Sequence, residues 1–381
     1  MRKQAGIFVL IDALGWEWAK STRFLEGVAP YRRGLESVLG YSAGAIPSIL
    51  TGLRPAQHGR LAMYQRAGAA GSPFQRLGWI CGLPPALVEN RYCRRALKHA
   101  ARRLCGIGGY FELYHIPLRY LPHLDVPEKE CVYRPGGIPG VQSIFDVLQA
   151  RGITYRAYWY ASGSDATLLS QVEDDLRRGE IEFYFLYLAA VDAYLHEHAD
   201  DPGSVKNFLA DYDARLRRIY EIARRQFERV DLHVFSDHGM APTHSTVDLL
   251  SILARISIDP IESYLVMVDS TMARFWFFSD AARDAIKSLL RDSEFGQWLS
   301  ESSLKSMGAW FPDRRYGDEI YLLSEGVVFA PSHMGLTAPK GMHGFHPAAP
   351  HSRASFLASQ DYGDELSSIT DIFGVMERYC A

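Results

Sequence analysis

The chain has 381 residues, of which 48% are hydrophobic and 22% charged, and its formal net charge is −3. This length and composition are typical of one large globular domain, or of a domain that carries an insertion. The near balance of charges argues against a nucleic-acid polymer as partner, because such proteins usually carry a basic excess.

The amino-terminal sequence MRKQAGIFVLIDALGWEW contains a short apolar run that ends at Asp12. Residues 6–11 are predicted to form a first β-strand rather than a signal peptide, because no clean cleavage site of small residues follows. No uninterrupted apolar run reaches the ~20 residues of a membrane-spanning helix. The five cysteines form no CxxC motif, so reduced thiols and a cytoplasmic location are expected.

Residues 39–59 read LGYSAGAIPSILTGLRPAQHG, a small and glycine-rich stretch with one early hydroxyl, Ser42. Residues 45–51 are predicted to be helical, with Pro47 in the first turn, where proline is tolerated. Ser42 is then either an N-cap of this helix or a group placed among free backbone N–H groups, which favour a bound phosphate.

Residues 60–139 are rich in arginine, aromatic residues, glycine and proline, and show no strong strand signal. Six lysine and arginine residues between Arg91 and Arg103 lie on an expected helix. One interpretation is a solvated basic helix. The other is a lid over an anionic, partly apolar substrate, or a weak contact with a membrane surface through residues 91–120.

Further apolar runs at residues 154–160, 182–190 and 230–236 alternate with helical patterns at 142–151 and 205–230. Strands that alternate with helices predict an α/β fold with a mostly parallel central sheet flanked by helices. Residues 256–335 interrupt this alternation with strand-like runs at 263–268, 272–278 and 319–323 and a helical pattern at 281–290. We expect this segment to form a small α+β insertion.

Polar residues follow three of the predicted strands, at the sheet edge where open α/β folds bind ligands. They are Asp12, then Asp192 and His196, then Asp237 and His238, and a later segment, KGMHGFHP, adds His343. An aspartate after a strand is often only a helix N-cap. Taken together, oxygen and imidazole ligands suit Zn²⁺ or a similar divalent ion, and six of them allow two metals, an arrangement suited to phosphoryl transfer.

Five segments in order resemble the alkaline phosphatase superfamily, in particular its type I phosphodiesterase/nucleotide pyrophosphatase branch. These are IFVLIDALG, the serine that precedes TGLRPAQHG, VDAYLHEH, FSDHGM and MHGFHP. The resemblance implies an alkaline-phosphatase-like core at residues 1–255 and 336–381, which contains the 60–139 insertion, and a cap-like insertion at 256–335. It also implies that the family nucleophile, nine residues before Thr51, is Ser42.

The resemblance assigns one metal ion to Asp12, Ser42, Asp237 and His238, and the other to Asp192, His196 and His343. The expected cofactors are two divalent ions, Zn²⁺ by default with Mn²⁺ as the alternative. The implied activity is hydrolysis of a small-molecule phosphodiester or pyrophosphate through a phosphoseryl intermediate. The oligomeric state stays open.

Two departures from the family pattern widen the range of substrates and activities that the sequence allows. Nucleotide pyrophosphatases usually carry a threonine nucleophile, whereas serine occurs in monoesterases and mutases of the superfamily. A phosphate-contacting asparagine of the branch is replaced here by Met63. Tyr64, Arg60 or a residue of the 60–139 insertion is expected to take over its contact, unless the phosphate is held differently. Arg314 or Arg315 is expected either to face the substrate or to belong to a solvated surface pair. The alternatives are a phosphomonoesterase, a phosphonate hydrolase, a phosphotransferase, or an inactive metal-binding protein.

Overall fold

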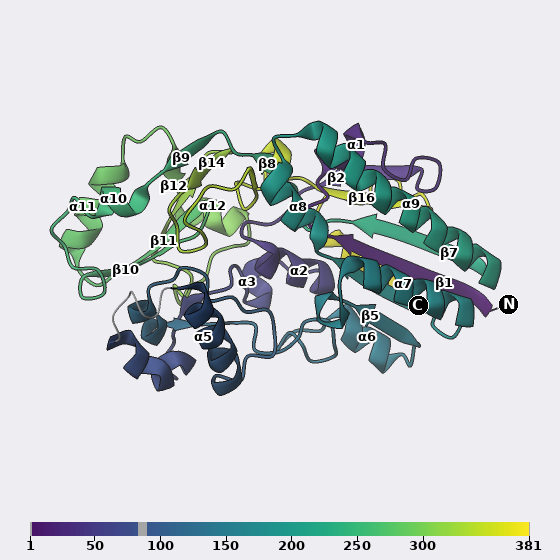
Figure 1. Cartoon of the computed structure of the whole chain (residues 1–381), viewed down its shortest axis with the longest axis horizontal. Helices are drawn as coiled ribbons and strands as arrows, with labels where there is room; N and C mark the ends of the chain where they lie inside the picture. The colour runs from purple at the N-terminus through teal and green to yellow at the C-terminus, as the bar shows by residue number, and fades with distance from the viewer. Residues whose placement is uncertain (1, 83–89, 381) are drawn as a thin grey trace.

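The computed structural model describes residues 2–82 and 90–380, and its centre is a six-stranded sheet in the order β2-β16-β7-β1-β6-β5 (Figure 1). The strands are β1 (Arg2–Ile11), β2 (Tyr31–Leu35), β5 (Tyr155–Tyr158), β6 (Phe183–Leu188), β7 (Phe227–Phe235) and β16 (Ala354–Ala358). Strands β7, β1, β6 and β5 are parallel to one another, whereas β16 pairs antiparallel with both β7 and β2. The predicted α/β fold with a mostly parallel sheet is therefore confirmed.

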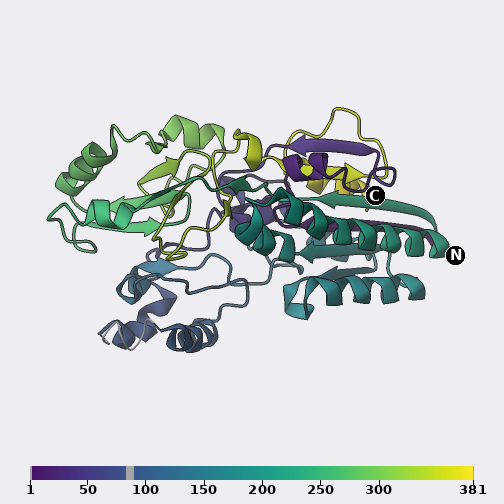
Figure 2. The same ribbon diagram turned by 45° about the horizontal axis from the view of Figure 1, so that its top comes forward.

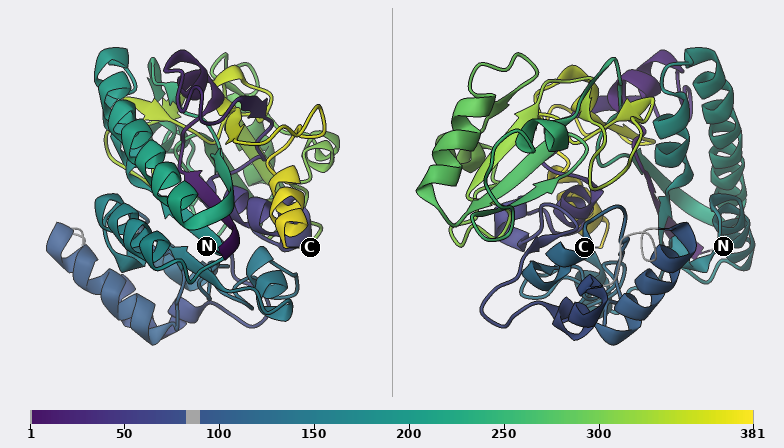
Figure 3. Two further views of the ribbon diagram at one scale, coloured as in Figure 1. Left: turned by 90° about the vertical axis from the view of Figure 1, so that its right-hand side faces the viewer. Right: turned by 60° about the vertical axis from the view of Figure 1, so that its left-hand side comes forward.

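Alternating side chains of β1 enter two separate hydrophobic cores, one on each face of the sheet. Ile7, Val9 and Ile11 pack on one face against α7 (Asp165–Arg178), α8 (Ala190–His198) and α9 (Pro202–Gln226). Helices α7 and α9 lie side by side along this face (Figure 3). Phe8 and Leu10 pack on the other face against α2 (Ser42–Thr51), α6 (Ile144–Ala150) and α13 (Asp371–Tyr379). This burial on both faces explains why β1 reads as a continuous apolar run.

A second, antiparallel sheet lies beside the first and has the order β10-β11-β13-β12 (Figure 2). Its elements are β10 (Tyr264–Val268), β11 (Met272–Phe277), α11 (Asp280–Leu290), β12 (Gly296–Trp298), α12 (Glu301–Ser306) and β13 (Glu319–Leu323). The strand-like and helical patterns expected in the 256–335 segment agree with these elements. Neither the short β12 nor the short α12 was predicted.

Short elements connect the two sheets. They are α3 (Pro55–His58), α10 (Leu249–Leu253), the parallel pair β9 (Ser245–Val247) and β14 (Val327–Phe329), and the antiparallel pair β8 (Ala241–Pro242) and β15 (Gly341–Met342). Helix α1 (Trp16–Ser21) instead joins β1 to β2 within the main sheet. Single 3₁₀ turns span Tyr160–Ser162 and Pro350–Ser352. The β8–β15 pair brings the loop with His343 next to the loop that follows β7.

The 60–139 segment packs against the second sheet. It contains β3 (Gln65–Arg66), α5 (Arg91–Leu104), β4 (Leu124–Asp125) and 3₁₀ segments at Pro73–Gly82 and Leu118–His123. Its apolar residues share one core with Leu265, Met267 and Trp276 of β10 and β11. The expected basic helix is confirmed as α5, but several of its cations bond within the segment, for example Lys98 to Glu112.

Candidate active site

The three polar strand ends meet because their strands are neighbours in the sheet. Leu10 lies opposite Phe235 of β7, and Ile11 lies opposite Leu188 of β6. One or two residues farther along, Asp12 therefore lies next to Asp237 and to the start of α8. This register brings residues from three distant parts of the sequence to one edge of the sheet.

Asp12, Asp237 and His238 form a first buried group whose ligand atoms all lie within 4.8 Å of one another. The His238 Nε2 atom is 3.5 Å from Asp12 Oδ1 and 3.2 Å from Asp237 Oδ2. It is also 2.9 Å from the Ser42 hydroxyl oxygen. The backbone N–H groups of Ala13 and His238 donate to the other oxygen of Asp237 and so fix the orientation of its carboxylate.

Asp192, His196 and His343 form a second group of the same kind. Asp192 and His196 are four residues apart on α8, which places both side chains on one face of the helix. Asp192 Oδ2 is 3.3 Å from His196 Nε2, and its Oδ1 is 3.5 Å from His343 Nε2. The rings of His238 and His343 stack with centroids 3.8 Å apart, so the two groups are in direct contact.

Backbone carbonyls orient two of the histidines. The Nδ1 atom of His196 lies 2.8 Å from the carbonyl oxygen of Gly341, and that of His238 lies 3.0 Å from the carbonyl of Gly239. A carbonyl can only accept, so each Nδ1 carries the proton and each Nε2 presents a lone pair. This tautomer is the one that binds a metal through Nε2.

Four buried atoms of the two groups have no hydrogen-bond partner among the described residues. They are Asp12 Oδ1, Asp192 Oδ1, Asp237 Oδ2 and His343 Nδ1. Buried polar atoms without partners are rare in folded proteins because each costs free energy, unless an ion or a water completes the site. The donor set, three carboxylates and three imidazoles, fits two divalent cations.

The pKa directions at the site reflect this crowding of charges. Burial and the adjacent Asp237 raise the pKa of Asp12 well above its usual range. Burial by itself would raise the pKa of Asp192. The nearby His196 and His343 outweigh this effect and hold the pKa below its ordinary value. Burial and the stacked His238 lower the pKa of His343. The neutral imidazole of His343 is the form that can act as a metal ligand.

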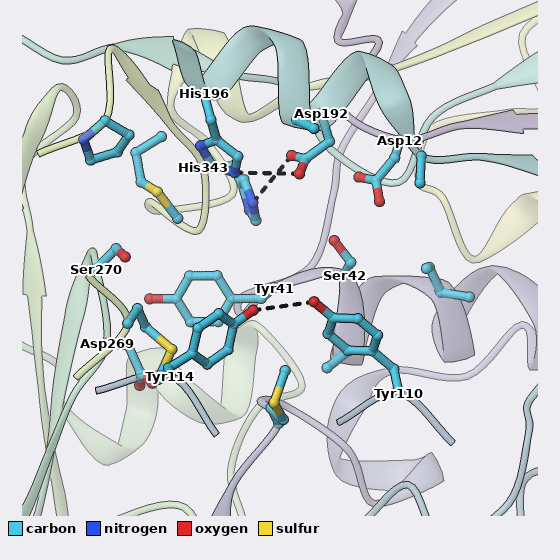
Figure 4. Close-up of a pocket in the computed structure, with 18 of the residues that line it drawn as sticks. Asp12, Tyr41, Ser42, Tyr110, Tyr114, Asp192, His196, Asp269, Ser270 and His343 are labelled. Atoms are coloured by element: carbon cyan, nitrogen blue, oxygen red, sulfur yellow. Dashed lines mark hydrogen bonds and ion pairs between the residues drawn. The ribbon is translucent and has the colours of Figure 1, made fainter. Parts of the chain in front are cut away.

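Ser42 is the first residue of α2, and Tyr41 precedes it as the N-cap residue, with an extended backbone. The interpretation of Ser42 as an N-cap is therefore wrong. The helix starts three residues earlier than predicted, so Pro47 lies in its interior rather than in the first turn. The Ser42 side chain points into the cavity from the positive end of α2, where free N–H groups attract an anion (Figure 4).

A cavity of about 610 Å³ is lined by Asp12 of the first group, by all three residues of the second group and by Ser42. Figure 4 shows Asp12, Asp192, His196 and His343 on one side of it and Tyr110 and Tyr114 on the other. The residues that sequence analysis missed are Tyr41, Tyr110, Tyr114, Glu128, Tyr133, Tyr160, Tyr187, Asp269 and Ser270. Only the aromatic-rich stretch around Tyr110 gave a sequence signal. That stretch belongs to the 60–139 segment, which therefore contributes a wall of the cavity.

The three expected substrate contacts do not line this cavity. Tyr64 is buried, and its hydroxyl donates to the carbonyl of Glu112. The guanidinium of Arg60 is also buried and donates to a backbone carbonyl at 3.0 Å, while Arg315 forms an ion pair with a neighbouring aspartate. The structure thus does not bring Tyr64, Arg60 or Arg315 to the site, because each side chain is held by a partner elsewhere.

The fold and the site together define an α/β enzyme with a serine hydroxyl beside two groups of metal-ligating side chains. The sequence model of the type I phosphodiesterase/nucleotide pyrophosphatase family matches residues 41–345. The chain belongs to this family, within the alkaline phosphatase superfamily. A comparison with curated protein sequences finds no match.

Solved structures of ectonucleotide pyrophosphatase / phosphodiesterase 5 have a similar fold. The murine protein aligns with a TM-score of 0.67 at 15% identity, and the human protein with 0.67 at 14%. An inactive threonine-to-alanine variant of the murine protein in complex with AMP aligns with 0.66 at 15% identity. Each alignment covers 99% of this chain and 95% of the other chain. At such identities the likeness shows the fold.

No helix within residues 2–82 and 90–380 is both long and apolar enough to cross a membrane.

Proposed function

We propose that the protein hydrolyses a small-molecule phosphodiester or pyrophosphate through a phosphoseryl intermediate on Ser42. The observation that carries the proposal is the position of the Ser42 hydroxyl. It lies at the start of α2, 2.9 Å from His238 Nε2, in a cavity that Asp12 of the first group and all three residues of the second group also line. A nucleophile at a helix N-terminus is placed where a phosphate is favoured.

Asp12, Asp237 and His238, with Ser42, would hold one divalent metal ion, and Asp192, His196 and His343 would hold the other. Zn²⁺ is the proposed metal because three of the six side chains besides Ser42 are histidines, and Mn²⁺ is the alternative. When bound, such ions lower the pKa of a coordinated hydroxyl and stabilise negative charge on phosphoryl oxygens.

The proposed reaction consists of two displacement steps at phosphorus. The Ser42 hydroxyl gives its proton to solvent, its oxygen bonds to phosphorus, and the bond from phosphorus to the leaving oxygen breaks. The leaving group departs with a proton from solvent. Water then cleaves the phosphoserine and restores the hydroxyl. The backbone N–H groups at the start of α2 stabilise the negative charge on the phosphoryl oxygens in both steps.

The size and lining of the cavity favour a diester over a small monoester. The volume of about 610 Å³ exceeds what a phosphate group alone requires, and Met63, Val132 and Phe329 line the cavity with apolar side chains. A second substituent on phosphorus would occupy this space.

The test uses purified protein loaded with Zn²⁺ or Mn²⁺ and compares bis-p-nitrophenyl phosphate with p-nitrophenyl phosphate, with and without chelator. We expect chelator-sensitive turnover of the diester, and a fall of at least about 10³-fold in kcat for Ser42→Ala. Ser48→Ala in the same helix is a matched control, because the Ser48 hydroxyl is buried and bonds to Gly44 and His58. Preference for the monoester would point instead to a phosphatase or a phosphotransferase. Full activity of Ser42→Ala would exclude Ser42 as the nucleophile.

A further inference from the structure

The turn between β10 and β11 of the second sheet reaches the segments that carry Ser42 and His343. Thr271, a fully buried residue of this turn, bonds to a neighbour of each. Its hydroxyl oxygen lies 2.9 Å from the Tyr41 hydroxyl and 2.9 Å from the carbonyl oxygen of Gly344. Its backbone N–H donates to the Tyr41 hydroxyl at 3.2 Å. Tyr41 directly precedes Ser42 in the sequence, and Gly344 directly follows His343.

The chemistry of these groups fixes the direction of each hydrogen bond. A carbonyl oxygen can only accept, so the single proton of the Thr271 hydroxyl goes to Gly344. The Tyr41 hydroxyl therefore donates to Thr271 Oγ1, and it accepts from the Thr271 N–H. Each hydroxyl donates one bond and accepts one bond, so both are satisfied. Loss of either hydroxyl would leave polar atoms of the network without partners.

Tyr41 connects this turn to the metal-ligating side chains as well as to the nucleophile. It is the N-cap residue of α2, but its side chain makes no cap bond to the helix. The ring instead points from Ser42 toward the side of the cavity that carries Asp269 and Ser270 (Figure 4). The centroids of the Tyr41 and His343 rings are 5.7 Å apart at an interplanar angle of 75°, an edge-to-face contact. The second sheet thus holds the hydroxyl of a ring that packs against a metal ligand.

His343 is the histidine of the site that depends most on such packing. Backbone carbonyls orient His196 and His238, whereas the Nδ1 atom of His343 has no hydrogen-bond partner among the described residues. Its ring is held by stacking on His238 and by the edge of Tyr41. The neighbouring backbone is packed equally closely, because a Cβ atom added to Gly344 would lie 2.5 Å from the Tyr41 ring.

We propose that Thr271 is a positioning residue, which holds the Ser42 nucleophile and the His343 ligand in one fixed arrangement. The inference rests on the proposed function and adds a residue to its site. It gives a role in the reaction to the second sheet, which contributes none of the six proposed metal ligands. A small shift of the nucleophile relative to the metal ligands would disturb the alignment that displacement at phosphorus requires.

Three variants test this role. Thr271→Val keeps the shape of the side chain and removes its hydroxyl, Thr271→Ser keeps the hydroxyl, and Tyr41→Phe removes the tyrosine hydroxyl. We expect Thr271→Val and Tyr41→Phe each to weaken binding of at least one Zn²⁺ by about tenfold or more, in competition with a chromophoric chelator. At saturating Zn²⁺, kcat for bis-p-nitrophenyl phosphate should fall by about tenfold or more while KM stays within about twofold. Thr271→Ser should recover most of both losses.

A second pair of hydroxyls in the same part of the molecule is the matched control. The Ser293 hydroxyl donates to the carbonyl of Leu290 and accepts from the Tyr321 hydroxyl, and none of these three residues lines the cavity. Tyr321→Phe should lower the free energy of unfolding, measured with urea, and leave Zn²⁺ affinity and kcat unchanged. Because Thr271 and Tyr41 belong to one network, the double variant should lose little more Zn²⁺ affinity than either single variant.

The outcomes separate this inference from the proposed function. If Thr271→Val loses no more Zn²⁺ affinity and kcat than Tyr321→Phe, or if Thr271→Ser loses as much as Thr271→Val, the positioning role is wrong while the phosphodiesterase function stands. Should Thr271→Val fail to fold, Tyr41→Phe provides the same comparison. If the wild type binds Zn²⁺ but cleaves neither bis-p-nitrophenyl phosphate nor p-nitrophenyl phosphate, the proposed function fails. Weaker Zn²⁺ binding by Thr271→Val would then still support its hold on His343, and unchanged binding would overturn it.

Discussion

The contact between Tyr187 and Asp12 is a single hydrogen bond that supports the proposed metal site. The Tyr187 hydroxyl donates to Asp12 Oδ2, which leaves the unpartnered Oδ1 free for a cation. Such supporting bonds typically change metal affinity by about 10–100-fold. We therefore expect Tyr187→Phe to weaken Zn²⁺ binding by at least about tenfold, measured by competition with a chromophoric chelator.

A second tyrosine provides the control for this prediction. Tyr158 is buried like Tyr187, and its hydroxyl donates to a carboxylate, Asp175, at 2.7 Å, away from the cavity. Tyr158→Phe should lower the free energy of unfolding by about 1 kcal/mol, as loss of a buried hydrogen bond does, without changing Zn²⁺ affinity. Equal Zn²⁺ affinities for the two variants and the wild type would show that Tyr187 does not support the metal site.

At the scale of elements, sequence analysis correctly predicted strands that read as apolar runs and polar site residues that follow the ends of strands. Strands β1, β6 and β7 were predicted because burial on both faces makes them apolar runs. The run at residues 154–160 also predicted β5, although this edge strand is only partly buried. The six proposed metal ligands follow such strands or a late glycine-rich turn, so the fold brings them together. The start of α2 was misplaced because Tyr41 caps it without a side-chain hydrogen bond, and no residue type signals such a cap.

The small residues before and inside α2 are explained by close approach of the backbone. Gly40 has φ +118°, and a Cβ atom added there would lie 2.4 Å from the carbonyl oxygen of Leu61. A residue with a side chain would have to shift the chain that places Ser42. We expect Gly40→Ala to destabilise the fold by about 2 kcal/mol or more, and to reduce diester turnover, as measured by urea unfolding and by kcat.

Gly27 provides a control that distinguishes the steric clash expected at Gly40 from the strain of a positive φ angle. It also has positive φ, +83°, but no atom lies within 4 Å of an added Cβ. Gly27→Ala should therefore cost only the strain of the left-handed conformation, about 1 kcal/mol, with unchanged turnover. If the two variants lose equal stability and both keep full activity, the close approach to Leu61 is not what requires glycine.

At the scale of the whole molecule, the cavity combines residues from the main sheet, the 60–139 segment and the second sheet. Five of the six proposed metal ligands follow strands of the main sheet, and His343 follows β15 of the short β8–β15 pair. Tyr110 and Glu128 come from the 60–139 segment, and Asp269 follows β10 of the second sheet. These walls could not be predicted because they depend on packing between distant segments, which leaves no periodic pattern. For the same reason, Arg60 and Tyr64 looked like substrate contacts, although the fold buries both.

Three buried histidines in different parts of the molecule make its stability depend on pH. Burial lowers the pKa of His58 and of His233 to about 3, and that of His333 to about 4. In the unfolded chain each titrates near pH 6.5. Between these values the unfolded state binds more protons than the folded state, so the free energy of unfolding falls as the pH decreases from about 6.5 towards 4.

His233→Phe tests this dependence with the least structural change. The His233 ring stacks on Phe8 with centroids 4.4 Å apart and an interplanar angle of 6°, a contact that phenylalanine can keep. Loss of the bond to the Tyr362 hydroxyl adds a cost that does not vary with pH. We expect urea unfolding at pH 7, 6, 5 and 4 to show a slope that is smaller by about 1 kcal/mol per pH unit in the variant. His99→Gln, at an exposed position of α5, is the control, and parallel pH profiles for wild type and His233→Phe would show that the proton uptake of unfolding does not involve His233.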